Sequence, residues 1–401
     1  MSRVLYIQYT NPAGYPPLQH SSRILADAGW QVLFLGTGAA GAGALNFPPH
    51  RDITVRRMNF CKAGWRQKLH YLRYCLWVLA VALFWRPRWI YASDPFSCPP
   101  AALLTFVPGL RVLYHEHDSP PRPRSGNAFL SFISRARRLV ARRADLCVLP
   151  NAQRLARFAE DSGPLRHSAC VWNCPGLYEV PASPRALSQP PVWVLYHGSI
   201  VPERLPPVVL DALALLPESV HLRVVGYETI GASGYVAQLR RKAESLGLAG
   251  RVEFLKPVSR QDLFASTMRS DIGLALIPAR SSDLNFEAMT GASNKVFDYL
   301  ACGLPVIVSD LPEWREMFVV PGYGLACDPG DPESLAAAIR WFVENPAQMR
   351  SRGNAGRRRI LEEWNYDNLF QPVARRMNGQ PDLFPSTARP PVETAAHPTP
   401  K

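Results

Sequence analysis

Short apolar runs alternate with longer amphipathic segments along most of the chain, which is the pattern of strands that alternate with helices. In the first half, the runs expected to form strands cover residues 3–8, 31–37, 53–58, 89–94, 111–118, 146–151 and 169–174. The segments between most of them, such as 18–28 and 65–85, have the length and pattern of helices. Because parallel strands need a crossover between them, the alternation predicts a parallel sheet covered on both faces.

The alternation stops once, at a stretch rich in Pro and Ser over residues 175–191, and then resumes. In the second half, strands are expected at 192–198, 221–226, 251–257, 272–278, 306–310 and near 324–328, and helices at about 204–216, 235–246, 332–344 and 346–362. This predicts two α/β domains, at 1–178 and 192–362, joined by a linker at 179–191. We expect residues 363–379 to pack back on the first domain and the Pro-rich tail, 380–401, to be disordered.

The segment 65–85 contains an uncharged run, LWVLAVALFW, that begins at Leu76. Ten residues are too few for a membrane span, which needs about 20. Three Trp lie along the segment, and basic residues flank it: Arg66, Lys68, Arg73, Arg86 and Arg88, with a further set at Arg135, Arg137, Arg138, Arg142 and Arg143. Two interpretations stay open, a helix that covers the sheet and a helix that lies on an anionic membrane surface.

The net charge of +13 favours anionic partners such as phosphates or an acidic membrane, although an Arg-rich composition in general explains it equally well. No zinc-finger or RNA-recognition motif is present, so we expect no nucleic-acid partner. The eight Cys include no CxxC pair and no set at zinc spacing, which fits a reducing cytoplasm and predicts no metal site. The chain opens on a strand pattern, so no signal peptide is expected.

The segment NKVFDYLACGLPVIVSD, residues 294–310, carries the most chemistry. It predicts a helix that stops at Gly303, in a left-handed conformation, followed by a buried strand that opens at Pro305. The unpaired amides at such a helix N-terminus favour an anion such as phosphate. Lys295 lies in the first turn, where a cation is unfavourable unless an anion binds nearby. Asp298, one turn further on, is placed to accept hydrogen bonds from a sugar hydroxyl.

This segment resembles the nucleotide-sugar signature PNKLFEYMAAGLPVV of glycosyltransferase family 4. The matching positions are Asn294, Lys295, Phe297, Tyr299, Ala301, Gly303, Pro305 and Val306. The resemblance implies the GT-B fold, two Rossmann-like domains that face each other across a cleft, and a nucleoside diphosphate sugar as donor. It also implies that Asp298 binds the ribose. The family's second acid, eight residues earlier, is replaced by Thr290, and Glu287 is the nearest acid.

Other residues of the expected site follow the strands. The turn HGSIVPERLP resembles the first turn of the family's second domain, with Gly198 and Arg204 at the phosphate. In YHEHDS, His115 and His117 share one face of a strand, and the resemblance places His117 near the sugar. Gly14 and His20 belong to the first loop, which in the family borders the acceptor and the donor phosphates. Asp310 is expected to face the cleft and Asn173 to hold the hinge.

We therefore expect a hexosyltransferase with His117, Arg204 and Lys295 at the reaction centre and a donor site of Gly198, Arg204, Glu287, Asn294, Lys295 and Asp298. The resemblance implies a retaining reaction without metal or other cofactor. A glycan or lipid-linked acceptor, used in the cytoplasm or at the inner membrane face, would serve surface polysaccharide or glycolipid assembly. Two alternatives remain, a sugar-nucleotide epimerase of the same fold, which releases no free nucleoside diphosphate, and a non-catalytic partner, which need not bind the donor.

Overall fold

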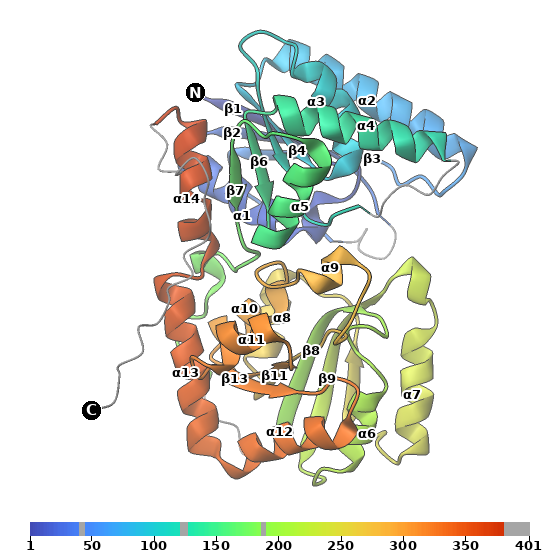
Figure 1. Ribbon diagram of the computed structural model, residues 1–401, viewed down its shortest axis with the longest axis vertical. Coiled ribbons are helices and arrows are strands. Elements are labelled where there is room, and N and C mark those ends of the chain that lie inside the picture. Colours follow the sequence, from blue (N-terminus) through green and yellow to red (C-terminus); the bar gives the residue numbers. More distant parts are fainter. Residues whose placement is uncertain (40–44, 121–126, 186–189, 381–401) are drawn as a thin grey trace.

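A computed structural model of the chain describes residues 1–39, 45–120, 127–185 and 190–380. Two parallel sheets, each with helices on both faces, lie one above the other along the long axis of the molecule (Figure 1). The fold class predicted from the alternation of apolar runs is therefore confirmed. The tail that was expected to be disordered lies outside the described residues from 381 onward, as do residues 186–189 of the expected linker.

The first sheet has seven parallel strands in the order β3-β2-β1-β4-β5-β6-β7. Its strands are β1 (Arg3–Ile7), β2 (Gln31–Thr37), β3 (Ile53–Met58), β4 (Trp89–Ser93), β5 (Arg111–His115), β6 (Leu146–Leu149) and β7 (Ser168–Cys170). Its helices are α1 (Pro16–Asp27), α2 (Trp65–Trp85), α3 (Cys98–Leu104), α4 (Ala128–Arg143) and α5 (Ala152–Ser162), with single helical turns at Pro12–Gly14 and Pro95–Ser97.

The second sheet has six parallel strands in the order β10-β9-β8-β11-β12-β13. Its strands are β8 (Val192–Ile200), β9 (Val220–Glu228), β10 (Val252–Leu255), β11 (Ile272–Ala275), β12 (Val306–Ser309) and β13 (Gly324–Cys327). The helices are α6 (Val208–Ala214), α7 (Tyr235–Ser245), α8 (Arg260–Thr267), α9 (Leu284–Glu287), α10 (Asn294–Ala301), α11 (Pro312–Trp314), α12 (Pro332–Glu344), α13 (Pro346–Glu362) and α14 (Tyr366–Met377). Further helical turns lie at Leu177–Glu179, Ile230–Ala232 and Arg315–Val319.

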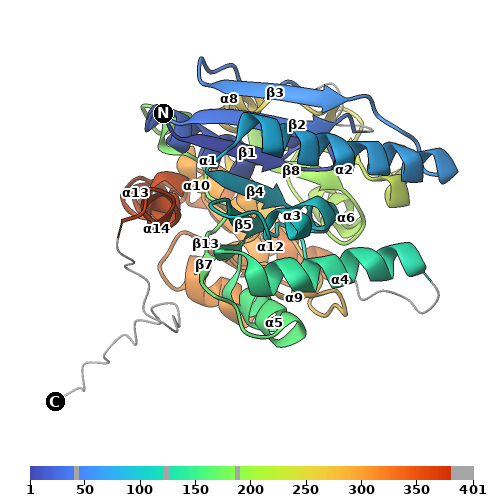
Figure 2. The same ribbon diagram turned by 90° about the horizontal axis from the view of Figure 1, so that it is seen from above.

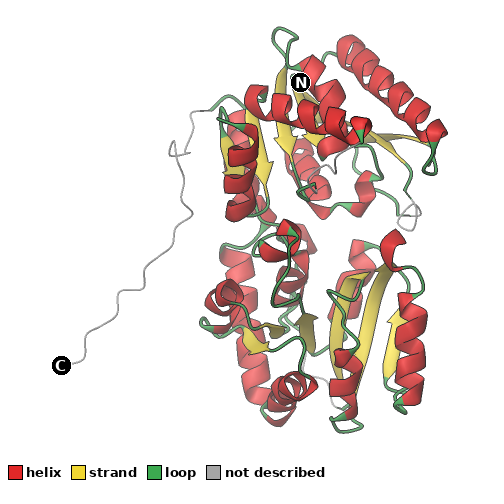
Figure 3. Cartoon of the chain, turned by 45° about the vertical axis from the view of Figure 1, so that its right-hand side comes forward, coloured by secondary structure: helices red, strands yellow, loops and turns green. Residues whose placement is uncertain are grey.

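Helices lie on both faces of each sheet (Figure 3). Each sheet separates two apolar cores, because successive side chains of a strand point to opposite faces. In β1, Leu5 and Ile7 pack with α2, α3 and α4, whereas Val4 and Tyr6 face α1. In the second sheet, α6, α7 and α12 cover one face, and α8, α10 and the end of α13 cover the other. Strands buried on both faces explain the continuous apolar runs of the sequence.

The strand order reverses once in each sheet, between β1 and β4 in the first and between β8 and β11 in the second. In open parallel sheets, ligands bind beyond the carboxyl ends of the strands at this reversal. The residues that follow β1, β4 and β8 therefore mark where each domain offers a ligand site. In both domains these ends face the region between the two sheets (Figure 1).

The last helix, α14, belongs to the core of the first domain, although it follows the second domain in sequence. Phe370, Val373 and Met377 pack with Val4 and Tyr6 of β1. The backbone amide of Tyr366 also donates to the carbonyl of Pro175, 2.9 Å away. With α13, α14 forms a column along one side of the molecule that spans both sheets (Figures 1 and 2).

Several expected boundaries differ from the structure. The helix expected from about residue 204 begins at Val208, and Arg204 lies in the turn before it. Pro206 and Pro207 explain the delay, since a residue that precedes proline disfavours helical geometry. The strand expected over 111–118 ends at His115, so the rest of the His-Glu-His segment lies beyond the sheet. The expected stop at Gly303 is confirmed by its φ of +80°.

Candidate active site

Lys295 and Gly198 meet near the carboxyl end of β8, although about one hundred residues separate them in sequence. A Cβ at Gly198 would lie 2.9 Å from Lys295 Nζ, so a larger residue would shift the end of the Lys295 side chain. The φ of Gly198, +113°, also favours glycine. Lys295 projects from the first turn of α10, whose N-cap residue, Ser293, makes no side-chain cap bond.

Arg204 is the second cation at this point. Burial holds the pKa of Lys295 well below its usual range, and the neighbouring guanidinium of Arg204 adds to this effect. Among the described residues, Lys295 forms no hydrogen bond or ion pair, and Arg204 donates only to Ser199 Oγ, at 3.0 Å. Two cations that repel each other without a carboxylate partner make a site for an anion with more than one negative charge.

Asp298 lies beside this pair, but its carboxylate is already engaged. Arg260 donates to both oxygens, at 2.8 and 3.0 Å, and Asn294 Nδ2 donates to Oδ2 at 3.3 Å. Burial raises the pKa of Asp298 to about 6, against the pull of Arg260 in the other direction. The side chain is 1% exposed. A ribose that binds Asp298 must therefore share it with Arg260, and the ribose role stays a prediction.

His20 lies on the far side of Arg260 and not beside the two cations. Its Nδ1 lies 3.0 Å from the hydroxyl of Tyr178, and its Nε2 lies 3.4 Å from Glu179. Arg260 bonds Glu179 at 2.8 and 3.0 Å, so one chain of contacts runs from α1 through Glu179 to Asp298. Burial lowers the pKa of His20 to about 4. Its contacts in the structure are those of a hinge residue.

The loop between α9 and α10 carries the position at which the family signature has its second acid. Thr290 donates its hydroxyl to Glu313 Oε2, 2.7 Å away, and Gln153 of α5 contacts the other oxygen of Glu313. Glu287 is exposed at the end of α9. The carboxylate in contact with Thr290 is therefore that of Glu313. Sequence reasoning missed it because Glu313 follows a different strand, β12.

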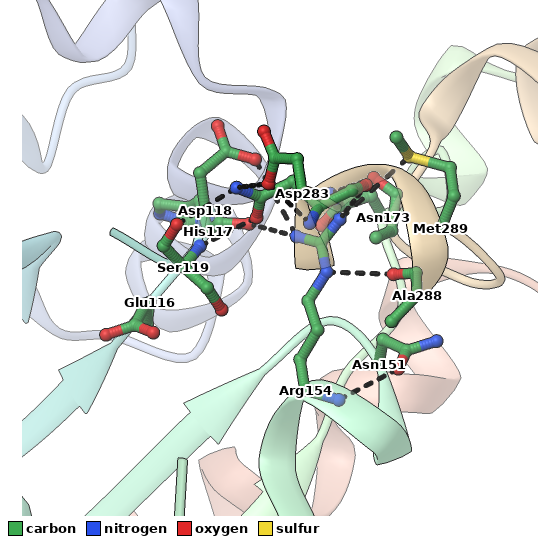
Figure 4. Close-up of polar contacts among 12 residues, drawn as sticks. Glu116, His117, Asp118, Ser119, Asn151, Arg154, Asn173, Asp283, Ala288 and Met289 are labelled. Atoms are coloured by element: carbon green, nitrogen blue, oxygen red, sulfur yellow. Dashed lines mark hydrogen bonds and ion pairs between the residues drawn. The ribbon is translucent and has the colours of Figure 1, made fainter. Parts of the chain in front are cut away.

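Arg154 of α5 fastens this loop to the first domain (Figure 4). Its Nε donates to the carbonyl of Ala288 and its Nη2 to that of Asn285, both at 2.8 Å. Its Nη1 donates to the carbonyl of His117 at 3.0 Å. The side chain is 1% exposed, so all three bonds are shielded from water. No local pattern in the sequence identifies such a residue, because its partners are backbone carbonyls far along the chain.

Three amide side chains strengthen the same contact. Asn151 donates to the carbonyl of Thr290 at 2.6 Å, and Asn173 donates to that of Ala292 at 2.7 Å. Asn285 exchanges two hydrogen bonds with the backbone of Ser119, at 2.8 and 2.9 Å. Asn173, expected at the hinge, thus joins the two domains directly. The loop between α9 and α10 and the first domain therefore form one continuous wall.

The first domain contributes His115 and His117, whose ring centres lie 4.0 Å apart. His115 is fully buried and lies 2.6 Å from the hydroxyl of Tyr91, whereas His117 Nε2 lies 3.1 Å from Ser93 Oγ. Glu116 points the other way and pairs with the buried Arg137. The shared face expected for the two His is present, but His115 belongs to the core. Arg137 is likewise not part of an exposed basic set.

Gly14 ends the helical turn Pro12–Gly14 and is exposed. The next residue, Tyr15, places its ring 5.3 Å from that of His117. The first loop therefore reaches the His-Glu-His segment, whereas His20 does not. Asp310, expected to face the cleft, is exposed and pairs with Arg315. The structure thus groups Gly14 with His117, and Gly198 with Arg204, Lys295 and Asp298.

A pocket of about 810 Å³ opens beyond β1 and β2, next to the start of α2. It is lined by aromatic rings with polar groups between them: Tyr9, Phe60, Trp65, Tyr71, Phe96 and Phe129, with Thr10, Thr37, Gln67, Lys68 and His70. Within the described residues, no three His, Cys, Asp or Glu side chains gather as metal ligands would. No helix of the described residues is long and apolar enough to cross a membrane.

Comparison with known proteins gives matches over both domains. Residues 184–359 match the family of glycosyl transferases group 1, and residues 18–174 match the glycosyl transferase 4-like domain. Glycogen synthase of Mycobacterium tuberculosis is 22% identical over 90% of this chain and 92% of its own length. A GDP-mannose-dependent phosphatidylinositol monomannoside mannosyltransferase of Mycolicibacterium smegmatis is 24% identical over 38% of this chain and 39% of its own.

Solved structures share the fold. HepE of Anabaena in complex with UDP and glucose superposes with a TM-score of 0.69 at 19% identity, over 94% of this chain and all of that chain. WaaG, a glycosyltransferase involved in lipopolysaccharide biosynthesis, superposes with a TM-score of 0.64 at 13% identity, over 94% and 100% of the two chains. These structures have the same two-domain arrangement of parallel sheets.

Proposed function

Given that this chain belongs to the GT-B glycosyltransferases of the family 4 type, we propose that it moves a hexose from a nucleoside diphosphate sugar to a glycan or lipid-linked acceptor. The observation that carries the proposal is the pair of cations, Lys295 and Arg204, without a carboxylate partner beside Gly198. A diphosphate is the leaving group that matches them in charge. The names of similar proteins, which include UDP and GDP-mannose, support a nucleotide sugar as donor.

In the proposed reaction, the bond between the anomeric carbon and the diphosphate oxygen breaks, and the oxygen keeps the electron pair. Lys295 and Arg204 face the charge that grows on this oxygen, and the amides at the start of α10 add to their effect. This supports transfer without a divalent metal. Asp298 and Asn294 would hold the nucleoside, and His117 the sugar, as the family resemblance implies. The same resemblance implies retention of the anomeric configuration.

A panel of nucleotide sugars tests the proposal. Binding raises the free energy of unfolding by RT ln(1 + [L]/Kd), so the true donor should give the largest increase in Tm. That donor should then release free nucleoside diphosphate in the presence of EDTA. Loss of release in EDTA that magnesium or manganese restores would refute the metal-independent role of the two cations. Donor binding without any release would favour the non-catalytic alternative, and an epimerised donor would favour the epimerase.

We further propose that the acceptor is lipid-linked and that the first domain docks on an anionic membrane. One face of α2 packs on the sheet, and the other exposes Leu69, Leu72, Leu76, Leu83 and Phe84. Phe84 is 88% exposed, so its ring does not pack on the sheet. Exposed basic residues border this stripe: Arg66, Lys68, Arg73 and Arg86. Acidic lipid attracts each such residue by about 1 kcal/mol, and the apolar stripe suits the interface.

Liposome flotation tests this docking. Binding to vesicles with anionic lipid should weaken as salt rises from about 0.05 to about 0.5 M. The variant Leu72→Ser/Leu76→Ser should lose binding, whereas Val320→Ser, at an apolar residue 78% exposed on the second domain, should keep it. A folded, monomeric protein that does not float at low salt would refute the docking and leave the transferase proposal intact.

A further inference from the structure

Arg260 joins two carboxylates that come from different parts of the molecule. It is the first residue of α8, and it pairs with Asp298 of α10 and with Glu179 of the connection between the two domains. Nη2 donates to both carboxylates, Nε only to Glu179 and Nη1 only to Asp298, all at 2.8 to 3.0 Å. Every nitrogen of the guanidinium is therefore used, which fixes the Arg260 side chain in one orientation.

The start of a helix is an unfavourable place for this cation. The first turn of α8 carries the positive end of the helix dipole, so a basic side chain there costs stability. The helix is already capped by Ser259, whose hydroxyl accepts the backbone amide of Asp262 at 3.2 Å. Arg260 is therefore not needed to begin α8, and the two carboxylates are what hold it there.

The Glu179 end of this bridge is anchored on the first domain. Glu179 lies in a helical turn in which the backbone amide of Leu177 donates to Asp367 of α14 at 2.7 Å. The hydroxyl of Tyr178, in the same turn, lies 3.0 Å from Nδ1 of His20 of α1. Because α1 and α14 both pack on the first sheet, the first domain sets the position of Glu179.

The Asp298 end has room for one more ligand. A carboxylate offers about four lone pairs to hydrogen-bond donors. Arg260 uses one on each oxygen, and Asn294 Nδ2 uses a second one on Oδ2, at 3.3 Å. Nε2 of His197, 3.5 Å from Oδ2, is buried and has no hydrogen-bond partner among the described residues. A free lone pair on Oδ1 and an open ring nitrogen mark a place for a polar ligand such as a hydroxyl.

We propose that Arg260 is a positioning residue for the donor, which orients the Asp298 carboxylate toward the ribose hydroxyls and anchors it on the interdomain connection through Glu179. The proposal rests on the transferase function above. Arg260 acts through Asp298 and not by contact with the donor. It gives the group that accepts the ribose hydroxyls a fixed position relative to the first domain. Glu179 therefore influences donor affinity, although it is not a ligand of the donor.

The charges around Asp298 decide how this bridge is tested. Burial raises the pKa of Asp298 to about 6, with Glu179 acting in the same direction and Arg260 and Lys295 in the other. The other titratable groups that interact with it are His197, Cys174, Tyr299 and Cys302. The ionised carboxylate is the stronger acceptor, so donor affinity should be complete above this pKa and decrease as the pH falls through about 6. The diphosphate of a nucleotide sugar is a diester and does not titrate in this range.

The test measures the donor Kd against pH by calorimetry, on the full chain and with the donor selected by the nucleotide-sugar panel. Arg260→Met removes the cation, so Asp298 should keep its proton to a higher pH. The decrease of donor affinity should move up by about 1–3 pH units, and the Kd at neutral pH should rise on the order of 10-fold. Arg223→Met is the matched control, since Arg223 pairs with Glu253 at 2.7 Å between β9 and β10.

A second variant, Glu179→Gln, should move the profile in the opposite direction. It keeps the pair of Arg260 with Asp298 but removes the negative charge that raises the pKa of Asp298. The decrease of donor affinity should therefore begin at a lower pH than in the wild type, with Glu253→Gln as control. A merely structural role of the bridge would weaken binding without opposite shifts of this pH in the two variants.

The outcomes separate this proposal from the transferase function. A wild-type pH profile in both folded variants would overturn the role of Arg260, while donor binding by the wild type would leave the transferase function intact. If Arg260→Met does not fold, the profile of Glu179→Gln decides alone. A wild-type chain that binds no nucleotide sugar would instead refute the transferase function, and the role of Arg260 with it.

Discussion

The two walls of the cleft differ in the buried ionisable groups that lack an oppositely charged partner. Among the described residues, Lys295 and Arg204 of the second domain form no ion pair with a carboxylate, and Asp94 of the first domain forms none with a cation. Several other buried charges of the described residues are paired with an opposite charge, for example Arg137 with Glu116 and Arg260 with Asp298. An unpaired buried charge destabilises the fold, so the two unpaired cations of the second domain favour an anionic ligand there. The comparison supports our proposal that the leaving diphosphate binds at the second domain.

The largest effect should come from the cationic wall. Lys295→Ala should lower kcat on the order of 10²–10³-fold, with a smaller change in KM, because the charge on the diphosphate grows in the transition state. The Tm should not fall, since Lys295 is buried without a partner. Steady-state kinetics with the selected donor measure both constants. The control is Lys242→Ala, which removes from α7 a cation that is paired with Asp211 of α6. An equal loss in both variants would contradict the comparison.

The second effect tests which contacts hold the two domains in position relative to each other. Arg154→Met leaves three buried carbonyls without their donor, which should lower the free energy of unfolding by about 2–4 kcal/mol. Turnover should fall with it, because the loop that carries Thr290 is no longer fixed to the first domain. Denaturant unfolding and small-angle scattering measure stability and domain separation. Arg157→Met, on the exposed face of the same helix, should change neither. An unchanged scattering profile in Arg154→Met would show that other contacts set the register.

A smaller effect is expected at Asp298, which is balanced by Arg260. Asp298→Asn keeps the size and shape of the side chain but removes its charge. If the ribose binds there, the binding free energy of the donor should weaken by about 1–3 kcal/mol. Calorimetry with the selected donor measures this, with Asp211→Asn as control. Unchanged affinity in a folded variant would remove Asp298 from the donor site and leave it as the partner of Arg260 alone.

The smallest effect concerns the hinge that joins the walls. The folded pKa of His20, about 4, lies below the unfolded value of about 6.5, so the unfolded chain binds the additional proton between these values. Stability should therefore be complete above pH 6.5 and decrease as the pH falls toward 4. The Tm of the wild type should decrease by about 2 °C or more relative to His20→Asn in this window. Parallel Tm curves would show that His20 does not titrate on unfolding. Burial raises the pKa of Glu179, but Arg260 outweighs it and the pKa is lowered to about 2, so the stability that Glu179 adds is complete above pH 4.5 and is lost only as the pH falls toward 2.

The cationic wall was predictable from the sequence because its residues lie in short segments with strong local patterns. Lys295 lies in the first turn of a helix that stops just before Gly303, and Gly198 lies near the end of an apolar strand. The contribution of the first domain was not predictable. Asp94 is distinguished by a backbone conformation that no local pattern shows, and Arg154 by contacts with carbonyls about 130 residues away. Arg260 was missed because its partner, Asp298, is 38 residues further along.

The return of α14 to the first domain has a consequence for synthesis on the ribosome. Phe370, Val373 and Met377 complete the core on one face of the first sheet. Until they leave the ribosome, the apolar side chains of β1 that face α1, Val4 and Tyr6, lack part of their cover. Domains generally fold in the order in which they are made, but here the first domain is finished last. A nascent chain that ends before Tyr366 therefore has a completed second domain and an incomplete first one, and it presents an apolar surface to chaperones.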